Sequence, residues 1–584
     1  MPPATPAAAR LRFVLDPRLF RASLIPLLVV LAIVAFSVGP LPGPLKSTIP
    51  SASFDGPRAY TTLRQLADAY PTRPAGSPAD DALAALVARR LTADGYSVHT
   101  TSAAAQTPGG SRRIVTVIAT QPGSGHGSLV LLAARDGSGA AALSGTAALL
   151  ELARELAGRS GLRPLTLVST SAAGAIAAAA EIPRPVSAAI VLGDLAGTRA
   201  RRPFVVPFSG DGSAASLALQ QTLTTALAAG ASRPSLLDQL AQLALPLSPG
   251  DQAPLLDAGI AAVLVQRSGE SGPSANEPLS EARLASFGHG ILAALAALQT
   301  PLRGAPSTRD LTLSGDRLPG DAVRWLVGAL LLAAALPALD VFARARRRHL
   351  ALARWLVWLL FWAAPFCAAV LFTKLLALCG VLPDLRIPVT GGARDVPELL
   401  GTLGLLALAC LLRARFVRRP VLDASDQSAG AGVTVVCVAT VLAIALWVAN
   451  PYTALLLALP LPLWTVLLTA ETERERTPLA GAIWLALSLV PLGGLLAVHA
   501  LALDLGPLGF ARTWLLLLAS GQLKPLGVLA LSLAGGLLAT VALLLIHPGG
   551  RPLPADIRIT MRGPITYAGP GSLGGTASGR PSGR

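Results

Sequence analysis

Long apolar segments occupy one stretch near the N-terminus and most of the C-terminal half of the chain. Residues 24–41 are uncharged, and such a run is just long enough to cross the hydrocarbon core of a bilayer. Seven further crossings are predicted at residues 322–339, 355–372, 399–412, 433–448, 453–469, 480–502 and 527–546. A short run at residues 514–518 is predicted to be interfacial or re-entrant. The pattern therefore predicts eight crossings.

Arginines follow every second predicted crossing. They cluster at residues 344–348, 413–419 and 474–476, and four more precede the first crossing. Because basic loops stay on the cytoplasmic side, these loops and the N-terminus are predicted to be cytoplasmic, and residues 46–320 extracytoplasmic. A cleaved signal peptide is the alternative interpretation of the first run. The net charge of +16 follows from these clusters, so no nucleic-acid partner is expected.

Between the apolar regions, residues 54–298 have the pattern of a water-soluble domain. Ser77 and Pro78 begin a predicted helix that Gly95 ends. Short β-rich runs follow at residues 114–119, 128–133, 165–169, 188–192 and 261–265, with helical stretches at 145–157 and 213–229 among them. Strands that alternate with helices predict an α/β fold, with a largely parallel mixed sheet between helices.

Composition and segment order together predict five parts. Apolar residues make up 52% of the chain and charged residues 14%, which is about half the charged fraction of soluble proteins. The parts are a cytoplasmic N-terminus with a transmembrane anchor (1–45), an extracytoplasmic α/β domain (46–300), a linker (301–320), an α-helical transmembrane bundle of about seven helices (321–547) and a disordered cytoplasmic tail (548–584). The richness in Arg, Ala, Gly and Pro is typical of a GC-rich bacterial genome, so a bacterial cell membrane is the expected location.

Four segments of the middle domain resemble the family-28 zinc metallopeptidases, which are di-zinc aminopeptidases. The first segments are Phe54-Asp55-Gly56-Pro57-Arg58 and Arg73-Pro74-Ala75-Gly76-Ser77-Pro78, and the later ones are Leu149-Leu150-Glu151-Leu152 and Gly250-Asp251-Gln252-Ala253-Pro254. Their order and spacing carry the resemblance over roughly residues 54 to 299. It implies a zinc-aminopeptidase-like fold.

Most residues that the family uses for catalysis are replaced in this chain. A di-zinc site needs histidine and carboxylate ligands and a glutamate base. The resemblance places the ligands at Ala134, Ala141, Ala173 and Asp194, and the general base at Ala172. Alanine cannot bind a metal, so no cofactor is expected, and zinc is expected only if the chain uses unusual ligands.

Three polar residues remain at the predicted site. Arg135 and Asp136 follow the strand at 128–133, and Asp194 follows the strand at 188–192. They are predicted to form a residual pocket, or else a leftover Arg–Asp pair that satisfies buried polar groups. Arg135 is expected to stand where metal would sit and to repel a divalent ion.

The order of segments is similar to the Gaa-type subunit of GPI transamidase, a non-catalytic relative of these peptidases. This similarity implies a catalytically inactive pseudopeptidase that acts in binding or complex assembly at the membrane. Membrane lipid and a protein, peptide or lipid-linked ligand are then the expected partners. One alternative is an active membrane-bound zinc aminopeptidase, and another is a transporter with an extracytoplasmic sensor domain.

Overall fold

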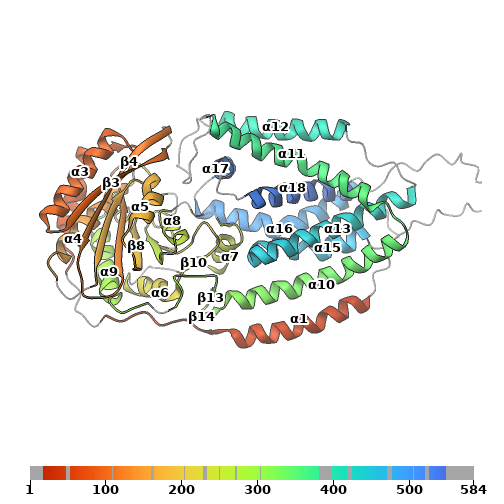
Figure 1. The fold of residues 1–584 in the computed structure, drawn as a ribbon, viewed down its shortest axis with the longest axis horizontal. Helices are drawn as coiled ribbons and strands as arrows, with labels where there is room; N and C mark the ends of the chain where they lie inside the picture. Colours follow the sequence, from red (N-terminus) through yellow and green to blue (C-terminus); the bar gives the residue numbers. More distant parts are fainter. Residues whose placement is uncertain are drawn as a thin grey trace, which may run out of the picture.

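The computed structural model describes residues 17–546 except 48–52, 108–109, 160–162, 203, 228–232, 247, 249, 270–271, 303, 380–395, 417–423, 470–476, 504–505 and 520–524. Two parts lie end to end, an α/β domain and a bundle of long helices (Figure 1). The predicted fold class is confirmed. The predicted tail and the Arg474 and Arg476 loop lie outside the described residues.

A seven-stranded mixed sheet forms the centre of the α/β domain, in the order β3-β4-β7-β5-β8-β11-β9. The strands are β3 (Ser97–Thr107), β4 (Gly110–Gln121), β5 (Ser128–Ala134), β7 (Leu165–Thr170), β8 (Val186–Leu192), β9 (Val205–Val206) and β11 (Ala262–Val265). Strands β7, β5, β8 and β11 are parallel, while β3, β4 and β9 pair antiparallel. The predicted strands are present, and β3 was not predicted.

Helices cover both faces of this sheet. Figure 1 shows α3, α4 and α9 on the side away from the bundle and α5 and α8 on the side toward it. The helices of the domain are α2 (Gly56–Ala69), α3 (Pro78–Ala93), α4 (Ser144–Leu156), α5 (Ala175–Glu181), α6 (Leu217–Ala226), α7 (Leu236–Ala244), α8 (Gln252–Asp257) and α9 (Glu281–Ala297). Helix α3 begins as predicted, because the Ser77 side chain accepts a hydrogen bond from the Asp80 amide and Pro78 occupies the first turn.

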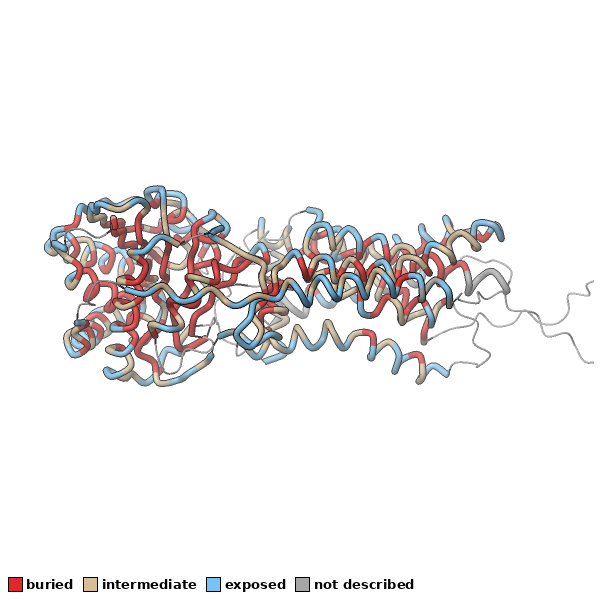
Figure 2. Tube along the Cα trace, turned by 90° about the horizontal axis from the view of Figure 1, so that it is seen from below, coloured by how far each residue is buried: buried red, intermediate tan, exposed pale blue. Residues whose placement is uncertain are grey.

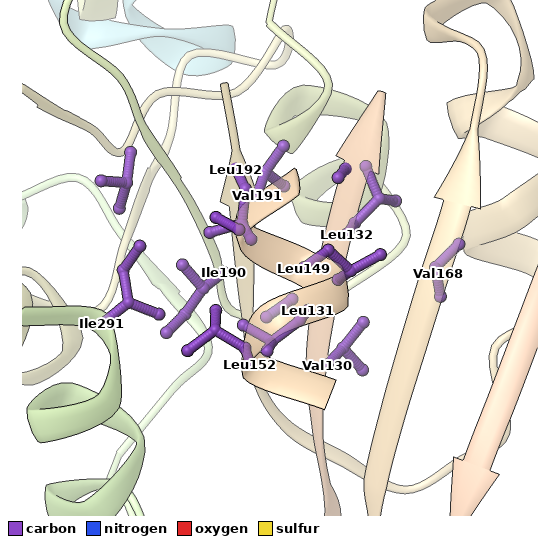
Figure 3. Packing of buried hydrophobic residues seen from close by; sticks show 14 of the residues in the cluster. Val130, Leu131, Leu132, Leu149, Leu152, Val168, Ile190, Val191, Leu192 and Ile291 are labelled. Atoms are coloured by element: carbon purple, nitrogen blue, oxygen red, sulfur yellow. The ribbon is translucent and has the colours of Figure 1, made fainter. Parts of the chain in front are cut away.

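Apolar side chains from the sheet and α4 form the core of the domain. Leu131 and Ile190, on adjacent parallel strands, lie against Leu149 and Leu152 of α4 (Figure 3). All four are at most 1% exposed. The central strands are buried on both faces, as parallel strands between helix layers require.

Two of the sequence segments with family resemblance meet on the outer face of this core. The Arg58 guanidinium lies against the carboxylates of Glu151 and Glu155, and Glu151 is only 4% exposed. Phe54 packs so closely on Gly288 that a Cβ there would lie 2.4 Å from the ring. These contacts hold α2, α4 and α9 together.

The bundle contains six helices among the described residues that are long and apolar enough to cross a membrane. They are α10 (Gly320–Arg347), α11 (Leu352–Leu378), α13 (Ala424–Ala449), the continuous pair α14 and α15 (Pro451–Ala458 and Pro460–Thr469), α16 (Pro478–Ala502) and α18 (Pro525–Ile546). Helices α1 (Pro17–Ser37) and α12 (Val396–Phe416) coincide with the other two predicted crossings, but their described apolar parts, 22–37 and 401–411, are shorter. Figure 2 shows exposed positions along the outer helices, and many of these carry large apolar side chains, as a lipid-facing surface requires.

Helix α17 (Pro507–Ala519) contains the run predicted to be interfacial or re-entrant. Its 13 residues are too few to span a bilayer core, which needs about 20. In Figure 1 it is seen end-on near the α/β domain while the other bundle helices run lengthwise, so it lies across their direction.

Short strands join the two parts where the chain passes between them. The predicted linker contains β12 (Ser307–Thr308), β13 (Leu311–Leu313) and β14 (Asp316–Leu318). Strand β14 pairs with β1 (Gly39–Pro40), which follows α1. Helices α1 and α10 also pack together, so the two segments that connect the domain to the bundle lie side by side.

Helix α7 fastens the α/β domain to the bundle through its C-terminal carbonyl groups. The side chains of Asn450 and Thr453 donate to the carbonyls of Leu243 and Ala244 at 2.7 Å each. The Nε2 atom of His499 on α16 lies 2.9 Å from the Ala241 carbonyl oxygen. The last carbonyls of a helix lack partners within it. Side chains of the bundle donate to those of Leu243 and Ala244 here, while the Ala241 carbonyl also accepts from the Leu245 amide.

This joint predicts the effect of removing one donor. Thr453→Val should leave the Ala244 carbonyl without its donor and lower the free energy of unfolding by about 1–3 kcal/mol. All eight tryptophans lie between residues 325 and 514, so thermal unfolding of the full chain in detergent, followed by tryptophan fluorescence, reports the bundle. Thr453→Ser keeps the hydroxyl and should melt like the parent chain; equal melting of both variants would show that this bond contributes nothing.

Candidate functional site

The predicted site residues lie at the carboxyl edge of the parallel strands. Strand β5 ends at Ala134, β7 at Thr170 and β8 at Leu192, and the residues that follow each end form the candidate site. Ligands of open α/β sheets bind at this edge. The structure brings together Asp136 with Ala172, and Asp194 with Ala141.

Arg135 points away from the place where metal was expected, so that prediction is wrong. Its Nε atom lies 2.7 Å from Asp80 Oδ1, and both side chains are 0% exposed. Its Nη atoms donate to the carbonyls of Ser169, at 2.8 Å, and Val115. Successive side chains of an extended segment face opposite sides, so Arg135 lies on the face opposite to Ala134 and Asp136.

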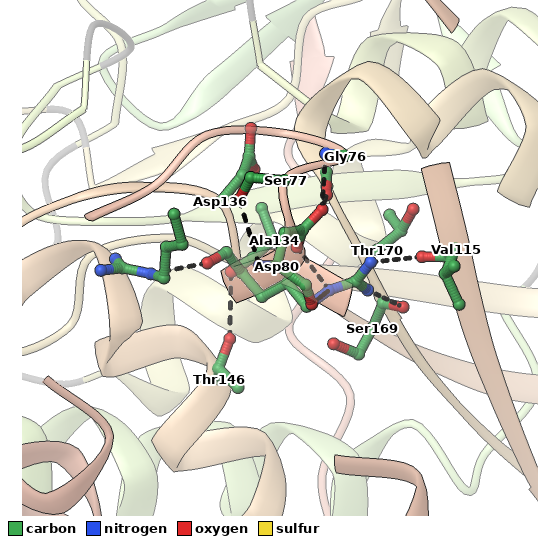
Figure 4. A network of polar contacts seen from close by, with 12 residues as sticks. Gly76, Ser77, Asp80, Val115, Ala134, Asp136, Thr146, Ser169 and Thr170 are labelled. Carbon is green, nitrogen blue, oxygen red and sulfur yellow. Dashed lines mark hydrogen bonds and ion pairs between the residues drawn. The ribbon is translucent and has the colours of Figure 1, made fainter. Parts of the chain in front are cut away.

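Asp80 is the centre of this buried network (Figure 4). Its Oδ2 atom accepts hydrogen bonds from the Gly76 amide at 2.9 Å and the Ser171 hydroxyl at 2.5 Å. The pair with Arg135 thus joins the start of α3 to the ends of β5 and β7. Burial lowers the pKa of Arg135, and the charge of Asp80 opposes this shift.

Asp136 lies beside Ala172, where the resemblance implies the general base of the family. Its Oδ1 atom accepts a hydrogen bond from the Ala172 amide at 2.8 Å. Burial raises the pKa of Asp136, while this hydrogen bond lowers it. Ala172 begins the short 3-10 helix η2 (Ala172–Gly174), which offers only methyl groups and backbone at this point.

Asp194 closes the turn after β8 with one carboxylate oxygen. Its Oδ1 atom accepts from the amides of Gly197 at 2.8 Å and Ala196 at 3.1 Å, and lies 3.1 Å from the Ser144 hydroxyl. Its Oδ2 atom is buried and makes no well-formed hydrogen bond to the described residues, although the Ser268 hydroxyl lies near the carboxylate and helps to lower its pKa. Burial raises the pKa of Asp194, and the hydrogen bonds from Gly197 and Ser144 lower it.

The alanines at the expected ligand positions surround these two carboxylates. Ala141 is 1% exposed, and its carbonyl oxygen lies 2.6 Å from the Ser144 hydroxyl that also contacts Asp194. The loop that carries Ala275 packs on Gly139, where a Cβ would lie 2.1 Å from the Ala275 carbonyl oxygen. In the described part of the chain, no three His, Cys, Asp or Glu side chains are grouped so that they could hold a metal ion.

Further buried polar groups at the same edge were not predicted as site residues. Asp251, which precedes α8, is 9% exposed, and none of the described residues is seen to hydrogen-bond its carboxylate. Burial raises its pKa to about 7, and the charge of Asp136 contributes to this shift. Gln252 Oε1 and Gln266 Nε2 are buried without partners among the described residues, and Ser268 Oγ is buried there without a well-formed hydrogen bond.

A sequence signal for these groups existed. Asp251 and Gln252 belong to one of the segments with family resemblance, and Gln266 and Ser268 follow directly after β11. Polar residues just after parallel strands are candidates for ligand contact. The arrangement offers carboxylate, amide and hydroxyl groups, so it can hydrogen-bond a small polar group. It offers no histidine among these residues to activate a nucleophile.

The similar solved structures cover less than half of this chain. No family model matches the chain, and no curated protein matches it. Among solved structures it is similar to glutaminyl cyclase of Porphyromonas gingivalis, with 16% identity, a TM-score of 0.32 and coverage of 42% of this chain and 99% of that one.

Two peptidase structures give similar values. A leucine aminopeptidase precursor from Bacteroides thetaiotaomicron has 14% identity, a TM-score of 0.36 and coverage of 43% of this chain and 99% of that one. A Zn-dependent exopeptidase from Parabacteroides distasonis has 16% identity, a TM-score of 0.32 and coverage of 42% and 99%. Such values say nothing of what this chain binds or catalyses.

The Arg135–Asp80 pair predicts a large loss of stability when one partner is removed. Arg135→Met should lower the free energy of unfolding of the α/β domain by about 3–5 kcal/mol, because a buried carboxylate loses its counter-charge. Calorimetry of the full chain in detergent measures this change. Arg89→Met, at an exposed position of α3, is the control. Adding Asp80→Leu should restore only part of the loss, since the Ser169 and Val115 carbonyls remain without donors.

Asp251 predicts that the domain loses stability as the pH rises from about 4 to about 7. In this range the folded chain holds a proton that the unfolded chain has released, because the pKa is raised from 3.8 to about 7. At 1.36 kcal/mol per unit, the full effect is about 4 kcal/mol. The Asp251→Asn variant should therefore lose less stability than the parent chain between pH 5 and pH 8 in calorimetry.

The pKa values of Asp136 and Asp194 are also raised. Part of the decrease of stability with pH should therefore remain in the Asp251→Asn variant. Asp68→Asn, on an exposed position of α2, is the control and should keep the slope of the parent chain. An unchanged slope in Asp251→Asn would contradict the assignment to Asp251.

Proposed function

We propose that the chain is a membrane-anchored, peptidase-like protein that is catalytically inactive and acts in binding or complex assembly at the membrane. One observation carries this proposal. At the carboxyl edge of the sheet, four alanines occupy the positions where the family resemblance implies metal ligands and a base, while Asp136 and Asp194 remain beside them.

The chemistry of metal-assisted hydrolysis supports inactivity. A catalytic zinc ion needs about three protein ligands and an open position for water, and peptide hydrolysis on it needs a base that takes the proton of that water. Ala172 and Ala173 supply neither a base nor a ligand. Asp194 Oδ1 is already used by two amides, which leaves only Oδ2 for a ligand.

The polar groups that remain support a binding role. A buried polar atom without a hydrogen bond costs about 1–3 kcal/mol. Gln252 Oε1 and Gln266 Nε2 are buried at one edge of the sheet without partners among the described residues. The Asp194 carboxylate and the Ser268 hydroxyl lie near one another at the same edge, with no well-formed hydrogen bond from Asp194 Oδ2 or Ser268 Oγ to the described part of the chain. A bound polar group, such as the end of a peptide or the head of a lipid-linked ligand, would satisfy them.

The distribution of arginines supports an orientation. Arg344 and Arg346 end α10, and Arg413 and Arg415 end α12; in Figure 1 the end of α10 and the start of α1 lie away from the α/β domain. Positive loops stay in the cytoplasm, so the α/β domain lies on the extracytoplasmic side. The membrane of this proposal is a bacterial cell membrane. The partners of the chain are membrane lipid and a protein or lipid-linked ligand, not nucleic acid.

Metal content and peptidase activity of the purified full chain test this function. The expected result is less than one zinc ion per chain after incubation with zinc and dialysis, and no cleavage of aminoacyl substrates above a buffer control. Two retained zinc ions per chain, with cleavage that a chelator abolishes and zinc restores, would establish the alternative of an active metallopeptidase with unusual ligands. Zinc retained without cleavage would contradict the ligand assignment but not the inactivity.

A further inference from the structure

Strand β3 is an exposed edge of the main sheet. It pairs with β4 on one side, and no described strand lies on its other side. Its 11 residues, Ser97–Thr107, include no Lys, Arg, Asp, Glu or Pro, and the register with β4 runs without a bulge. Proteins normally protect edges with charges, prolines or bulges, because an open edge pairs readily with another strand.

The register shows which backbone groups of β3 are available. Ser102 lies opposite Val115, and the Val115 carbonyl accepts a hydrogen bond from Arg135. That carbonyl therefore points away from β3. In an antiparallel pair, opposite residues exchange either both backbone hydrogen bonds or neither, so the amide and carbonyl of Ser102 point outward from the sheet.

The same holds at every second residue of the strand. By the two-residue period, the outward residues are Val98, Thr100, Ser102, Ala104 and Gln106. No backbone hydrogen bond joins the outward groups of these five residues to the described part of the chain. A row of alternating amides and carbonyls is matched by another extended polypeptide and not by a lipid or small molecule.

Strand β3 can pair with a second copy of itself. The five outward positions are spaced evenly on both sides of Ser102, so an antiparallel copy would place Ser102 opposite Ser102, Thr100 opposite Ala104 and Val98 opposite Gln106. The five pairs would exchange about ten backbone hydrogen bonds. No charged residue faces a like charge, and the exposed side chains at positions 100, 102 and 104 are small.

The orientation of the sheet also suits this pairing. Helices α4 and α9 lie on the far side of the sheet, and α5 and α8 lie on the side of the bundle, so the sheet lies across the bundle axis (Figure 1). A two-fold axis between antiparallel edge strands is perpendicular to the sheet. It therefore runs along the bundle axis, and both copies can sit in one membrane with the same orientation.

We infer that β3 is a dimerisation edge, which pairs with β3 of a second copy to form a continuous sheet across two chains. This interface shares no residue with the candidate site. It would hold whether or not the site binds or cleaves a ligand.

A disulfide at the two-fold axis tests this pairing. Opposite residues in such a pair have Cα atoms about 5.5 Å apart, within the range that a disulfide spans. Ser102→Cys in the full chain, reconstituted in liposomes and mildly oxidised, should run mostly as a dimer on a non-reducing gel. The parent chain, oxidised in the same way, is the control for cross-linking through its own four cysteines, which all lie at residue 367 or later.

The control is Thr61→Cys, which is exposed on α2 and lies outside β3. It should cross-link no more than the parent chain. Equal cross-linking of Ser102→Cys and Thr61→Cys would overturn the proposal.

A proline test separates the outward edge from the fold of the hairpin. Ala104→Pro removes an outward amide only, and proline is tolerated on edge strands. It should convert the dimer to a monomer in size-exclusion chromatography with light scattering, with the melting temperature close to that of the parent chain. Ala104→Val should remain dimeric.

Ala103→Pro instead removes an amide that faces β4, so it should lower the melting temperature. A parent chain that is monomeric in liposomes and in detergent would overturn the proposal. So would an Ala104→Pro variant that folds and remains a dimer, because another surface would then hold the two copies together.

Discussion

The buried ion pair between Arg135 and Asp80 determines the arrangement of the carboxyl edge of the sheet. Arg135 contacts the start of α3 and the carbonyls of β4 and β7, and Asp80 contacts the segment that follows β7 through Ser171. Two buried charges are costly unless they are paired and hydrogen-bonded. Four elements, α3, β4, β5 and β7, must therefore keep their places for this pair to remain satisfied, which ties β4 to the candidate site.

The fold of the domain does not depend on the residues that a metal site would need. The pair lies on the opposite face of the β5 end from Ala134 and Asp136, and the core behind it is made of aliphatic side chains. Asp194 fastens its own turn through the amides of Ala196 and Gly197. The sheet therefore forms with alanine at the positions where the resemblance implies metal ligands, and the carboxylates of Asp136 and Asp194 make structural hydrogen bonds.

The sequence predicted the elements that have a strong apolar pattern. It did not predict features that depend on contacts with residues far away in the chain. Strands β5, β8 and β11 contain continuous aliphatic runs and β7 contains three large aliphatic residues, whereas β3 consists mostly of Ser, Thr and Ala and has one large aliphatic residue, Val98. The direction of Arg135 could not be predicted because Asp80, its partner, lies 55 residues earlier in an element with its own capping signals. Asp136 and Asp194 were predicted from the family resemblance, whereas Gln266, which also follows directly after a strand, matches none of the segments that carry it.

The joint with the bundle gives the sheet a fixed orientation toward the membrane. The terminal carbonyls of helix α7 contact polar side chains of the bundle, and β1 and β14 pair where α1 and α10 meet the domain. Two separate attachments prevent the domain from rotating about either one. The edge strand β3 is then held in one orientation relative to the bilayer. All copies share one orientation in a membrane. Two domains held rigidly on their bundles therefore lose less rotational freedom when their β3 edges pair than two domains on flexible tethers would.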